Sequence, residues 1–437
     1  MNHPMMNTAT NAWSRRQFLA AVGTVSAAPL IVPASVLGRD GTVAPSNRIV
    51  MGNFGVGNRA RAILPHFMSN PEILMHVVCD CRADRLKSAK EMVDGFYKNT
   101  DCETQDDFRD LLARKDVDAV FIATGNRWHG MGSILAAKAG KDVYSEKPVS
   151  LTIAEGRALC DITKRLGIVY QGGHQRRNTD SYKFMAEVVR KGMIGKVHTV
   201  INQVWEGPVV KYAPPTPVPA GFNYDMWLGQ TPYRPFNWGH VNTWQYFWDT
   251  AEGVITDMGC HYTDLMQMTL NMDHTGPVEY EGKAEFPDPR EAYSETPIRG
   301  EVRCRYANGV TGVIAQRGKF ADRYIRFIGS EGWIQVDDQT NLITAEPKSI
   351  LSTRVINSKS WADTGDHIGD FVRAIKNRTL TSVHPEAAHR AISVCQLANI
   401  CLRLGRKLKW DPEKELFTND HDANRMLARA PRAPWRL

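Results

Sequence analysis

The chain has 437 residues, of which 43% are hydrophobic and 23% charged, a composition typical of globular proteins and unlike disordered or fibrous ones. Because this length exceeds one ordinary hydrophobic core, we expect two domains. The formal net charge of +7 comes from lysines and arginines that are spread along the chain without basic blocks, so we expect no nucleic-acid partner. No two of the eight cysteines have the two-residue gap of zinc clips or redox dithiols.

The N-terminus carries a pattern typical of an export signal. Ser14-Arg15-Arg16-Gln17-Phe18-Leu19 precedes an apolar stretch over residues 20–36, in the order that resembles a twin-arginine signal. An amphipathic helix with an accidental arginine pair is the alternative. We expect residues 1–40 to be a signal peptide and the protein to be periplasmic or otherwise exported. No later stretch reaches the roughly 18 apolar residues of a membrane span, so none is predicted.

Export bears on how a cofactor would be used. The twin-arginine route is associated with proteins that have already folded, often with a cofactor bound. No pool of free nicotinamide dinucleotide is maintained outside the cytoplasm. We therefore expect an enzyme exported in this way to hold its cofactor tightly and to return it to its starting redox state in each turnover.

A glycine-rich turn follows the first apolar strand. The strand begins at Ile49 and enters Gly52-Asn53-Phe54-Gly55-Val56-Gly57, after which a helical pattern begins. Strand, turn and helix in this order are the context of a dinucleotide site, because a pyrophosphate needs backbone N–H groups at a helix N-terminus and no obstructing side chain. Phe54 stands where the usual fingerprint has its second glycine. Taken alone, the turn fits an ordinary loop equally well.

An acidic residue ends the second strand. The apolar run 73–79 leads into Asp80, at close to the spacing of about 20 residues from the turn at which an acid meets the adenosine ribose. A carboxylate there repels a 2′-phosphate, so we predict NAD. Arg82 and Arg85 could stack on the adenine or accept a phosphate, which leaves NADP open. Capping of the next helix is a second and compatible role for Asp80.

The next motifs make a family resemblance apparent. An apolar run over 117–124 predicts a central parallel strand and leads into Asn126-Arg127-Trp128-His129, and a further strand ends in Glu146-Lys147-Pro148. Together with the glycine turn and Asp80, these motifs resemble the Gfo/Idh/MocA oxidoreductases, which include glucose-fructose oxidoreductase and inositol dehydrogenase, in the sub-branch with twin-arginine leaders. The resemblance runs from about Arg48 to the C-terminus.

The resemblance implies an α/β fold in two domains. A Rossmann domain with a doubly wound parallel sheet is expected at 41–170, and a substrate-binding and oligomerisation α/β domain with an open, mostly antiparallel sheet at 171–437. It also implies a set of residues that bind NAD(P). These are Gly52, Phe54, Gly55, Val56, Asp80, Arg85, Thr124, Asn126, His129, Glu146, Lys147 and Gln175.

Three residues are the predicted catalytic group by the same resemblance. Lys147 would lie between the nicotinamide ribose and the reacting hydroxyl, with Asp257 and His261 four residues apart on one helix. That spacing puts both side chains on the same helix face. With an ordinary pKa of about 6.5, His261 is the predicted acid/base. Asp257 would orient it or balance its charge, and Lys147 would stabilise the developing alkoxide.

Two further interpretations concern ligands of this region. Asp257, His261 and Asp264 could contribute to a metal site, but no additional ligand has diagnostic spacing, so no metal is predicted. A run of aromatic residues over 238–248 could stack on sugar rings, although core packing explains more than half of such tryptophans. The predicted substrate contacts are Arg176, His240 and Trp244.

The second half shows the alternation of an antiparallel sheet. Strand-like runs recur over 197–203, 278–284, 298–306, 310–316, 324–329 and 332–336. We expect a helix from Asp366 and another over 386–403 to pack back on the first domain. The proline-rich stretch 208–219 is interpreted as a loop. Because an open sheet face usually finds a partner in this family, we expect a homo-oligomer, dimeric or tetrameric.

Three functions are compatible with these residues. The first is an NAD(P)-dependent oxidoreductase acting on a CH–OH group of a sugar, sugar derivative or cyclitol, with a retained cofactor. The second is a redox-neutral glycosidase, which some relatives are: transient oxidation at C3 acidifies the C2 proton, elimination expels the aglycone, and reduction restores the sugar. The third is a non-catalytic sugar-binding protein, against which Lys147, Asp257 and His261 argue together.

Overall fold

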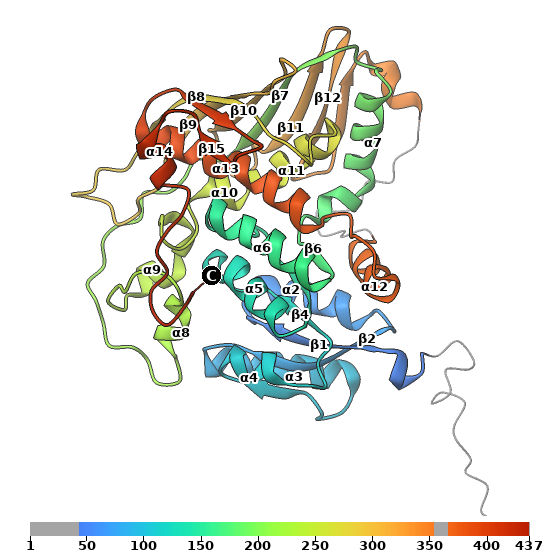
Figure 1. Ribbon diagram of the computed structural model, residues 1–437, viewed down its shortest axis with the longest axis vertical. Helices are drawn as coiled ribbons and strands as arrows, with labels where there is room; N and C mark the ends of the chain where they lie inside the picture. The colour runs from blue at the N-terminus through green and yellow to red at the C-terminus, as the bar shows by residue number, and fades with distance from the viewer. Residues whose placement is uncertain (1–42, 354–365, 437) are drawn as a thin grey trace, which may run out of the picture. The chain divides into compact units, whose positions relative to one another are not determined.

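A computed structural model describes residues 43–353 and 366–436 (Figure 1). The predicted signal peptide, 1–40, lies outside these residues. Residues 43–48 belong to a separate unit and contain one short 3-10 turn, η1 (Pro45–Asn47). Within the described residues, no helix has the length and apolar character needed to span a bilayer.

The first sheet is parallel throughout. Its strands are β1 (Ile49–Phe54), β2 (Ile73–Cys79), β3 (Glu103–Gln105), β4 (Ala119–Ile122), β5 (Asp142–Ser145) and β6 (Tyr170–Gly172). They lie in the order β3-β2-β1-β4-β5-β6, with every neighbouring pair parallel. The predicted doubly wound sheet is therefore confirmed. The strand order reverses between β1 and β4, which is where such a sheet opens a ligand crevice.

Helices cover both faces of this sheet. They are α2 (Asn58–Met68), α3 (Ala83–Tyr97), α4 (Phe108–Ala113), η2 (Asn126–Trp128), α5 (His129–Lys138) and α6 (Ile153–Leu166). Successive strand residues alternate between two cores: Val77 belongs to one and Val78 to the other. The second core also contains Phe371 from α12 (His367–Asn377), a helix far along the chain from these strands.

The second sheet is mixed and mostly antiparallel, as predicted. Its strands are β7 (Val197–Val204), β8 (Glu279–Glu285), β9 (Arg299–Arg305), β10 (Thr311–Gln316), β11 (Tyr324–Gly329), β12 (Gly332–Asp337), β13 (Ile343–Glu346), β14 (Leu408–Asp411) and β15 (Leu416–Phe417). Their order is β13-β12-β11-β7-β10-β9-β8-β14-β15, and only the β7–β10 pair is parallel. Burial alternates along β11, as expected for a sheet covered on one face.

The remaining helices lie between and beside the sheets. They are η3 (Gln175–Asn178), α7 (Asp180–Arg190), α8 (Tyr224–Leu228), α9 (Trp238–Asn242), η4 (Trp244–Tyr246), α10 (Val254–Asp257), α11 (Gly259–Thr269), η5 (Lys348–Thr353), α13 (Pro385–Leu404) and α14 (His421–Arg425). Figure 1 shows α13 running between α6 and the second sheet, and it packs on α6, α11 and β8. This long buried helix therefore joins the two halves.

Candidate active site

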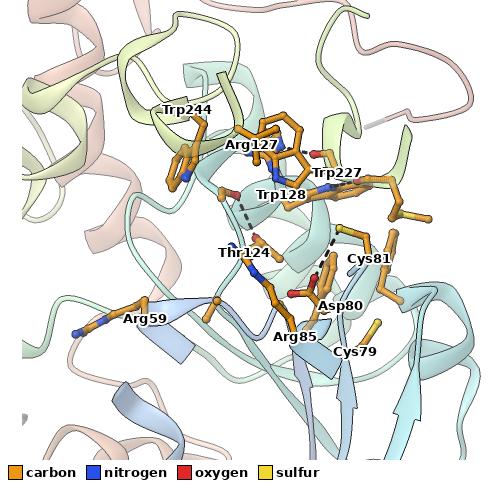
Figure 2. Close-up of a pocket in the computed structure, with 18 of the residues that line it drawn as sticks. Arg59, Cys79, Asp80, Cys81, Arg85, Thr124, Arg127, Trp128, Trp227 and Trp244 are labelled. Atoms are coloured by element: carbon orange, nitrogen blue, oxygen red, sulfur yellow. Dashed lines mark hydrogen bonds between the residues drawn. The ribbon is translucent and has the colours of Figure 1, made fainter. Parts of the chain in front are cut away.

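A cavity of about 360 Å³ opens at the reversal of strand order between β1 and β4 (Figure 2). Its lower side comes from the first sheet, and segments of α8, α9 and η4 close it from the other side. The lining residues are Phe54, Gly55, Gly57, Asn58, Arg59, Cys79, Asp80, Cys81, Arg85, Asp106, Phe108, Ala123, Thr124, Gly125, Arg127, Trp128, Met226, Trp227, Val241, Asn242, Trp244 and Gln245. This place and lining fit a dinucleotide.

The glycine turn needs glycine at Gly55. Its φ is +90°, a left-handed value, and a Cβ there would lie 2.9 Å from the backbone nitrogen of Thr124. The Gly55 N–H donates to the Cys79 carbonyl oxygen at 2.8 Å, and Gly57 is the N-cap of α2. The turn thus brings the N-terminus of α2 to the cavity with little side-chain bulk.

Asp80 holds the glycine turn against the second strand. Its carboxylate accepts hydrogen bonds from the backbone N–H of Val56 at 2.9 Å and of Arg82 at 3.0 Å. Burial raises the pKa of Asp80, and these hydrogen bonds and the nearby arginines oppose the increase. The expected helix cap takes a different form, because Arg82 is the N-cap of α3 and Asp80 binds its backbone. Asp80 also lines the cavity, together with Arg85.

His129 joins two strand ends. Its Nδ1 lies 2.8 Å from the carbonyl oxygen of Pro148, and its Nε2 lies 3.2 Å from that of Thr124. Burial lowers its pKa to about 4, so the ring is neutral and donates to one carbonyl at a time. Of the predicted cofactor residues, Phe54, Gly55, Asp80, Arg85 and Thr124 line the cavity. His129 instead fixes the segment that contains Lys147.

Arg59 links the cavity to that segment, and sequence reasoning missed it. Its Nε lies 3.0 Å from a carboxylate oxygen of Glu146, which is buried. With its amide oriented to satisfy both neighbours, Gln175 accepts from Arg59 and donates to the carbonyl oxygen of Gly173. The available signal was the position of Arg59 in the first turn of the helix that follows the glycine turn.

Lys147 and Asp257 are in direct contact. The Lys147 Nζ donates to the Asp257 carbonyl oxygen at 2.6 Å and to its carboxylate at 3.1 Å. Burial lowers the pKa of Lys147, but Asp257 and other negative groups outweigh burial and leave it raised. Lys147 is therefore an ammonium ion at neutral pH.

The prediction that Asp257 and His261 share one helix is wrong. Helix α10 ends at Asp257 and α11 begins at Gly259. The His261 N–H donates to the carbonyl oxygen of Met258, three residues back, at 3.1 Å. The Asp257 carbonyl oxygen, the usual acceptor four residues back, instead accepts from Lys147. This contact interrupts the helix and gives Asp257 a lysine partner.

His261 is a buried neutral imidazole. It is 4% exposed, and its Nδ1 has no hydrogen-bond partner among the described residues. Burial, followed by the charges of Arg176 and Lys147, lowers its pKa well below the ordinary value. The ring of His174, a residue not predicted, is fully buried with its centroid 5.9 Å away.

The three predicted substrate residues are found in different surroundings. Arg176 is paired with Asp338 through its Nη2 at 2.8 Å. His240 is fully buried against Phe247, with ring centroids 4.5 Å apart, so it lies in aromatic packing. Trp244 lines the dinucleotide cavity. None of these contacts places the three side chains around Lys147.

Asp264, weighed as a metal ligand, has an arginine partner. Its carboxylate lies 2.7 Å from Arg177 Nη2, and both side chains are buried. Burial raises the pKa of Asp264 to about 6, against the opposing charge of Arg177. The described parts of the chain contain no group of three or more His, Cys, Asp or Glu side chains that could hold a metal ion.

Comparison with known families agrees with this geometry. Residues 49–174 match the model described as "Oxidoreductase family, NAD-binding Rossmann fold", and residues 185–437 match "Oxidoreductase family, C-terminal alpha/beta domain". The chain belongs to the Gfo/Idh/MocA family. It is therefore a nicotinamide-dependent oxidoreductase, as the sequence predicted.

Three relatives indicate the range of similarity. The chain is 23% identical over 369 residues to myo-inositol 2-dehydrogenase of Thermotoga maritima, covering 82% of this chain and 98% of that one. It is 34% identical over 118 residues to a glycosyl hydrolase family 109 protein of Saccharopolyspora erythraea, 26% of each chain. The WlbA dehydrogenase of Bordetella pertussis, solved with NADH and UDP-GlcNAcA, shares the fold with a TM-score of 0.63 at 15% identity, covering 84% and 98%.

Proposed function

We propose that this Gfo/Idh/MocA protein transfers hydride at a hydroxyl-bearing carbon of a sugar, sugar derivative or cyclitol. The observation that carries the proposal is the Lys147–Asp257 contact, with the neutral His261 four residues along the chain from Asp257. This group is joined to the dinucleotide cavity through Glu146 and Arg59. The myo-inositol dehydrogenase and the UDP-GlcNAcA complex among its relatives support a polyhydroxylated substrate.

The protonation states give each side chain a distinct task. A neutral His261 accepts the proton of the substrate hydroxyl during oxidation and returns it during reduction. The Lys147 ammonium donates a hydrogen bond to the oxygen as negative charge develops there. Asp257 holds Lys147 in position and balances its charge, a role that the two hydrogen bonds support. Both charged partners are thus in place before a substrate arrives.

The cavity residues fit a nicotinamide dinucleotide, which would supply the hydride acceptor. Gly55 permits close approach of a phosphate, and the N-terminus of α2 faces the cavity. The buried Asp80 carboxylate favours ribose hydroxyls over a 2′-phosphate, so NAD is the preferred form. Binding of NAD at least about tenfold tighter than NADP would support this preference, and equal affinities would contradict it.

A retained cofactor follows from the export that residues 15–16 predict. The protein would be exported folded, with NAD bound, and would couple the oxidation of one sugar to the reduction of another. Protein purified from the export compartment should then contain dinucleotide that survives gel filtration. The measurement is the absorbance and mass of the nucleotide released when the protein is denatured.

A redox-neutral glycosidase is the second candidate. The similarity to the glycosyl hydrolase family 109 protein favours it, and this similarity covers 118 residues. The same residues would serve, because His261 could accept the first proton and Lys147 could stabilise the carbonyl oxygen during elimination. Oxidation at C3 and the later reduction would balance, so no external oxidant would be required.

One incubation separates these activities. Purified protein is mixed with an aryl glycoside and, separately, with a free sugar or cyclitol, without added cofactor. A ketosugar with an equal amount of reduced dinucleotide supports the oxidoreductase, and released aglycone with no net reduction supports the glycosidase. If neither a ketosugar nor a free aglycone forms with any substrate of a broad panel, only sugar binding remains and the proposal is contradicted.

A further inference from the structure

Arg127 is a buried arginine that has no acidic partner in the described part of the chain. The residue is 3% exposed, and its Nε donates to the carbonyl oxygen of Trp227. Its Nη1 is buried and makes no hydrogen bond, and no ion pair involves Arg127 within 43–353 and 366–436. Burial lowers its pKa to about 10, so the group remains charged at neutral pH.

Other buried arginines of this protein have carboxylates. Arg177 pairs with Asp264 at 2.7 Å and with Asp273 at 2.8 Å. Arg323 pairs with Asp338 at 3.0 Å. A buried charge is unfavourable unless it is paired, so the isolation of Arg127 indicates that its partner comes from outside the chain.

The cavity is the place from which that partner would come. Arg127 lines it, with its guanidinium 3.8 Å from the ring centroid of Trp227 and 5.8 Å from that of Trp244. These aromatic faces hold the group without neutralising it. Figure 2 shows Arg127 on the side of the cavity opposite Asp80 and Arg85, with Thr124 between them.

The backbone beside Arg127 is shaped to admit its guanidinium. A Cβ at Gly125 would lie 2.3 Å from Arg127 Nη1, so any larger residue there would displace the group. Gly125 follows Thr124, which packs against Gly55 of the phosphate turn. The guanidinium is therefore held at the turn after β4, and through Thr124 this turn packs on the glycine turn after β1, where the diphosphate of a dinucleotide lies in this fold.

We propose that Arg127 binds a diphosphate oxygen of the dinucleotide. This inference rests on the proposed function, because it takes a dinucleotide to be the ligand of the cavity. The diphosphate is shared by NAD and NADP, whereas the 2′-phosphate belongs to NADP alone. Because Trp227 lies in the second domain, the same side chain ties that domain to the bound cofactor.

The test compares two substitutions of Arg127 with a matched control. Arg127→Met removes the charge at similar length, and Arg127→Lys retains a charge. Gln230→Leu is the control, since the Gln230 amide donates to the Arg127 carbonyl oxygen at 2.7 Å and to the Glu155 carboxylate at 2.8 Å, and no hydrogen bond among the described residues joins it to the guanidinium. Full-length proteins are stripped of nucleotide, checked by circular dichroism, and titrated calorimetrically with NAD, NADP, ADP-ribose and adenosine.

Loss of a charge-assisted hydrogen bond should weaken NAD, NADP and ADP-ribose binding to Arg127→Met by roughly tenfold to hundredfold. Adenosine binding should stay unchanged, Arg127→Lys should fall between, and Gln230→Leu should bind like wild type. The proposal is overturned by an equal loss for adenosine, by a loss for NADP alone, or by an equal loss in Gln230→Leu.

The two levels of inference fail differently. A wild-type protein that binds none of the dinucleotides would contradict the proposed function. If the wild type and Arg127→Met bind the dinucleotides with equal affinity, only the role of Arg127 would be contradicted. If Arg127→Met does not fold, Arg127→Lys decides: undiminished affinity for ADP-ribose would count against a diphosphate contact that depends on guanidinium geometry.

Discussion

Two cations, the partly buried Lys147 and the buried Arg127, show how differently the reaction group and the cofactor cavity are built. Lys147 has its counter-ion within the protein, because Asp257 accepts its hydrogen bonds at 2.6 and 3.1 Å. Among the described residues, the guanidinium of Arg127 contacts only a backbone carbonyl oxygen and aromatic faces. The reaction group is thus neutralised in the free protein. The cavity keeps an uncompensated positive charge that an anionic ligand would neutralise.

The comparison separates positioning from binding. A side chain that must meet a developing negative charge benefits from a fixed orientation before the substrate arrives. A side chain that retains a cofactor contributes most when its interaction is made only on binding. Substitutions at the Lys147 group should therefore affect turnover, and substitutions around the cavity should affect cofactor affinity.

The largest expected effect is that of Lys147→Met. Removal of the ammonium should lower kcat by about a thousandfold, because the developing oxyanion loses its donor. The cofactor Kd, measured by calorimetry, should change little. Lys141→Met is a matched control, since the Lys141 Nζ donates to the Val117 carbonyl oxygen at 2.8 Å, and it should retain kcat. An unchanged kcat in Lys147→Met would refute the proposed chemistry.

Asp257→Asn should leave Lys147 without its carboxylate partner, so that it resembles Arg127. Burial lowers the pKa of Lys147, and Asp257 is the first of the charges that raise it. Without that charge the pKa should fall, so the protonated lysine would be lost at a lower pH. We expect kcat to drop about tenfold to hundredfold and the alkaline limb of its pH profile to move to lower pH. If kcat falls but the alkaline limb of the pH profile does not move, Asp257 acts only by positioning Lys147.

The pH profile of sugar oxidation tests the neutral state of His261. An ordinary histidine, with a pKa of about 6.5, would be about nine-tenths protonated at pH 5.5 and would leave about a tenth of the activity. The lowered pKa of His261 keeps it neutral there, so oxidation should persist through this range. Reduction, which uses the protonated form, should accelerate as the pH falls. An acid limb near 6.5 in the wild type, absent in His261→Gln, would contradict the lowered pKa.

The sequence predicted the framework better than the pairings within it. The strands expected over 73–79 and 324–329 have the observed bounds, because apolar runs and their end signals are local. The short strands β14 and β15 were missed, since two to four residues carry little periodicity. The helix break at Met258 was also missed, because it depends on Lys147, 110 residues away in sequence from Asp257.

The other features of the site that the sequence did not predict depend on which side chains are buried and what surrounds them. The motif around His129 was recognised, but the sequence could not show that both ring nitrogens lie against backbone carbonyl oxygens. Its neighbour Arg127 was not singled out, because an unpaired charge becomes informative only when the surrounding carboxylates are known. The sequence predicts a sugar contact at His240, and only the three-dimensional packing shows it buried against Phe247.

The smallest effect on turnover is expected from Trp435→Ala in the C-terminal segment. The Trp435 ring packs behind the cavity wall, with centroids 4.7 Å from Trp128 and 5.6 Å from Phe108. Its loss should cost about 3 kcal/mol of folding stability. It should also weaken NAD binding several-fold, because the wall loses its backing.

At saturating NAD the kcat of Trp435→Ala should equal that of the wild type, since Lys147 and Asp257 keep their contact. Thermal unfolding, calorimetric titration and steady-state kinetics on the same preparation measure the three quantities. Leu380→Ala, at a residue 77% exposed, is the control and should change none of them. A fall in kcat as large as the loss of affinity would mean that the cavity wall and the reaction group are mechanically coupled, and the separation of binding from positioning would not hold.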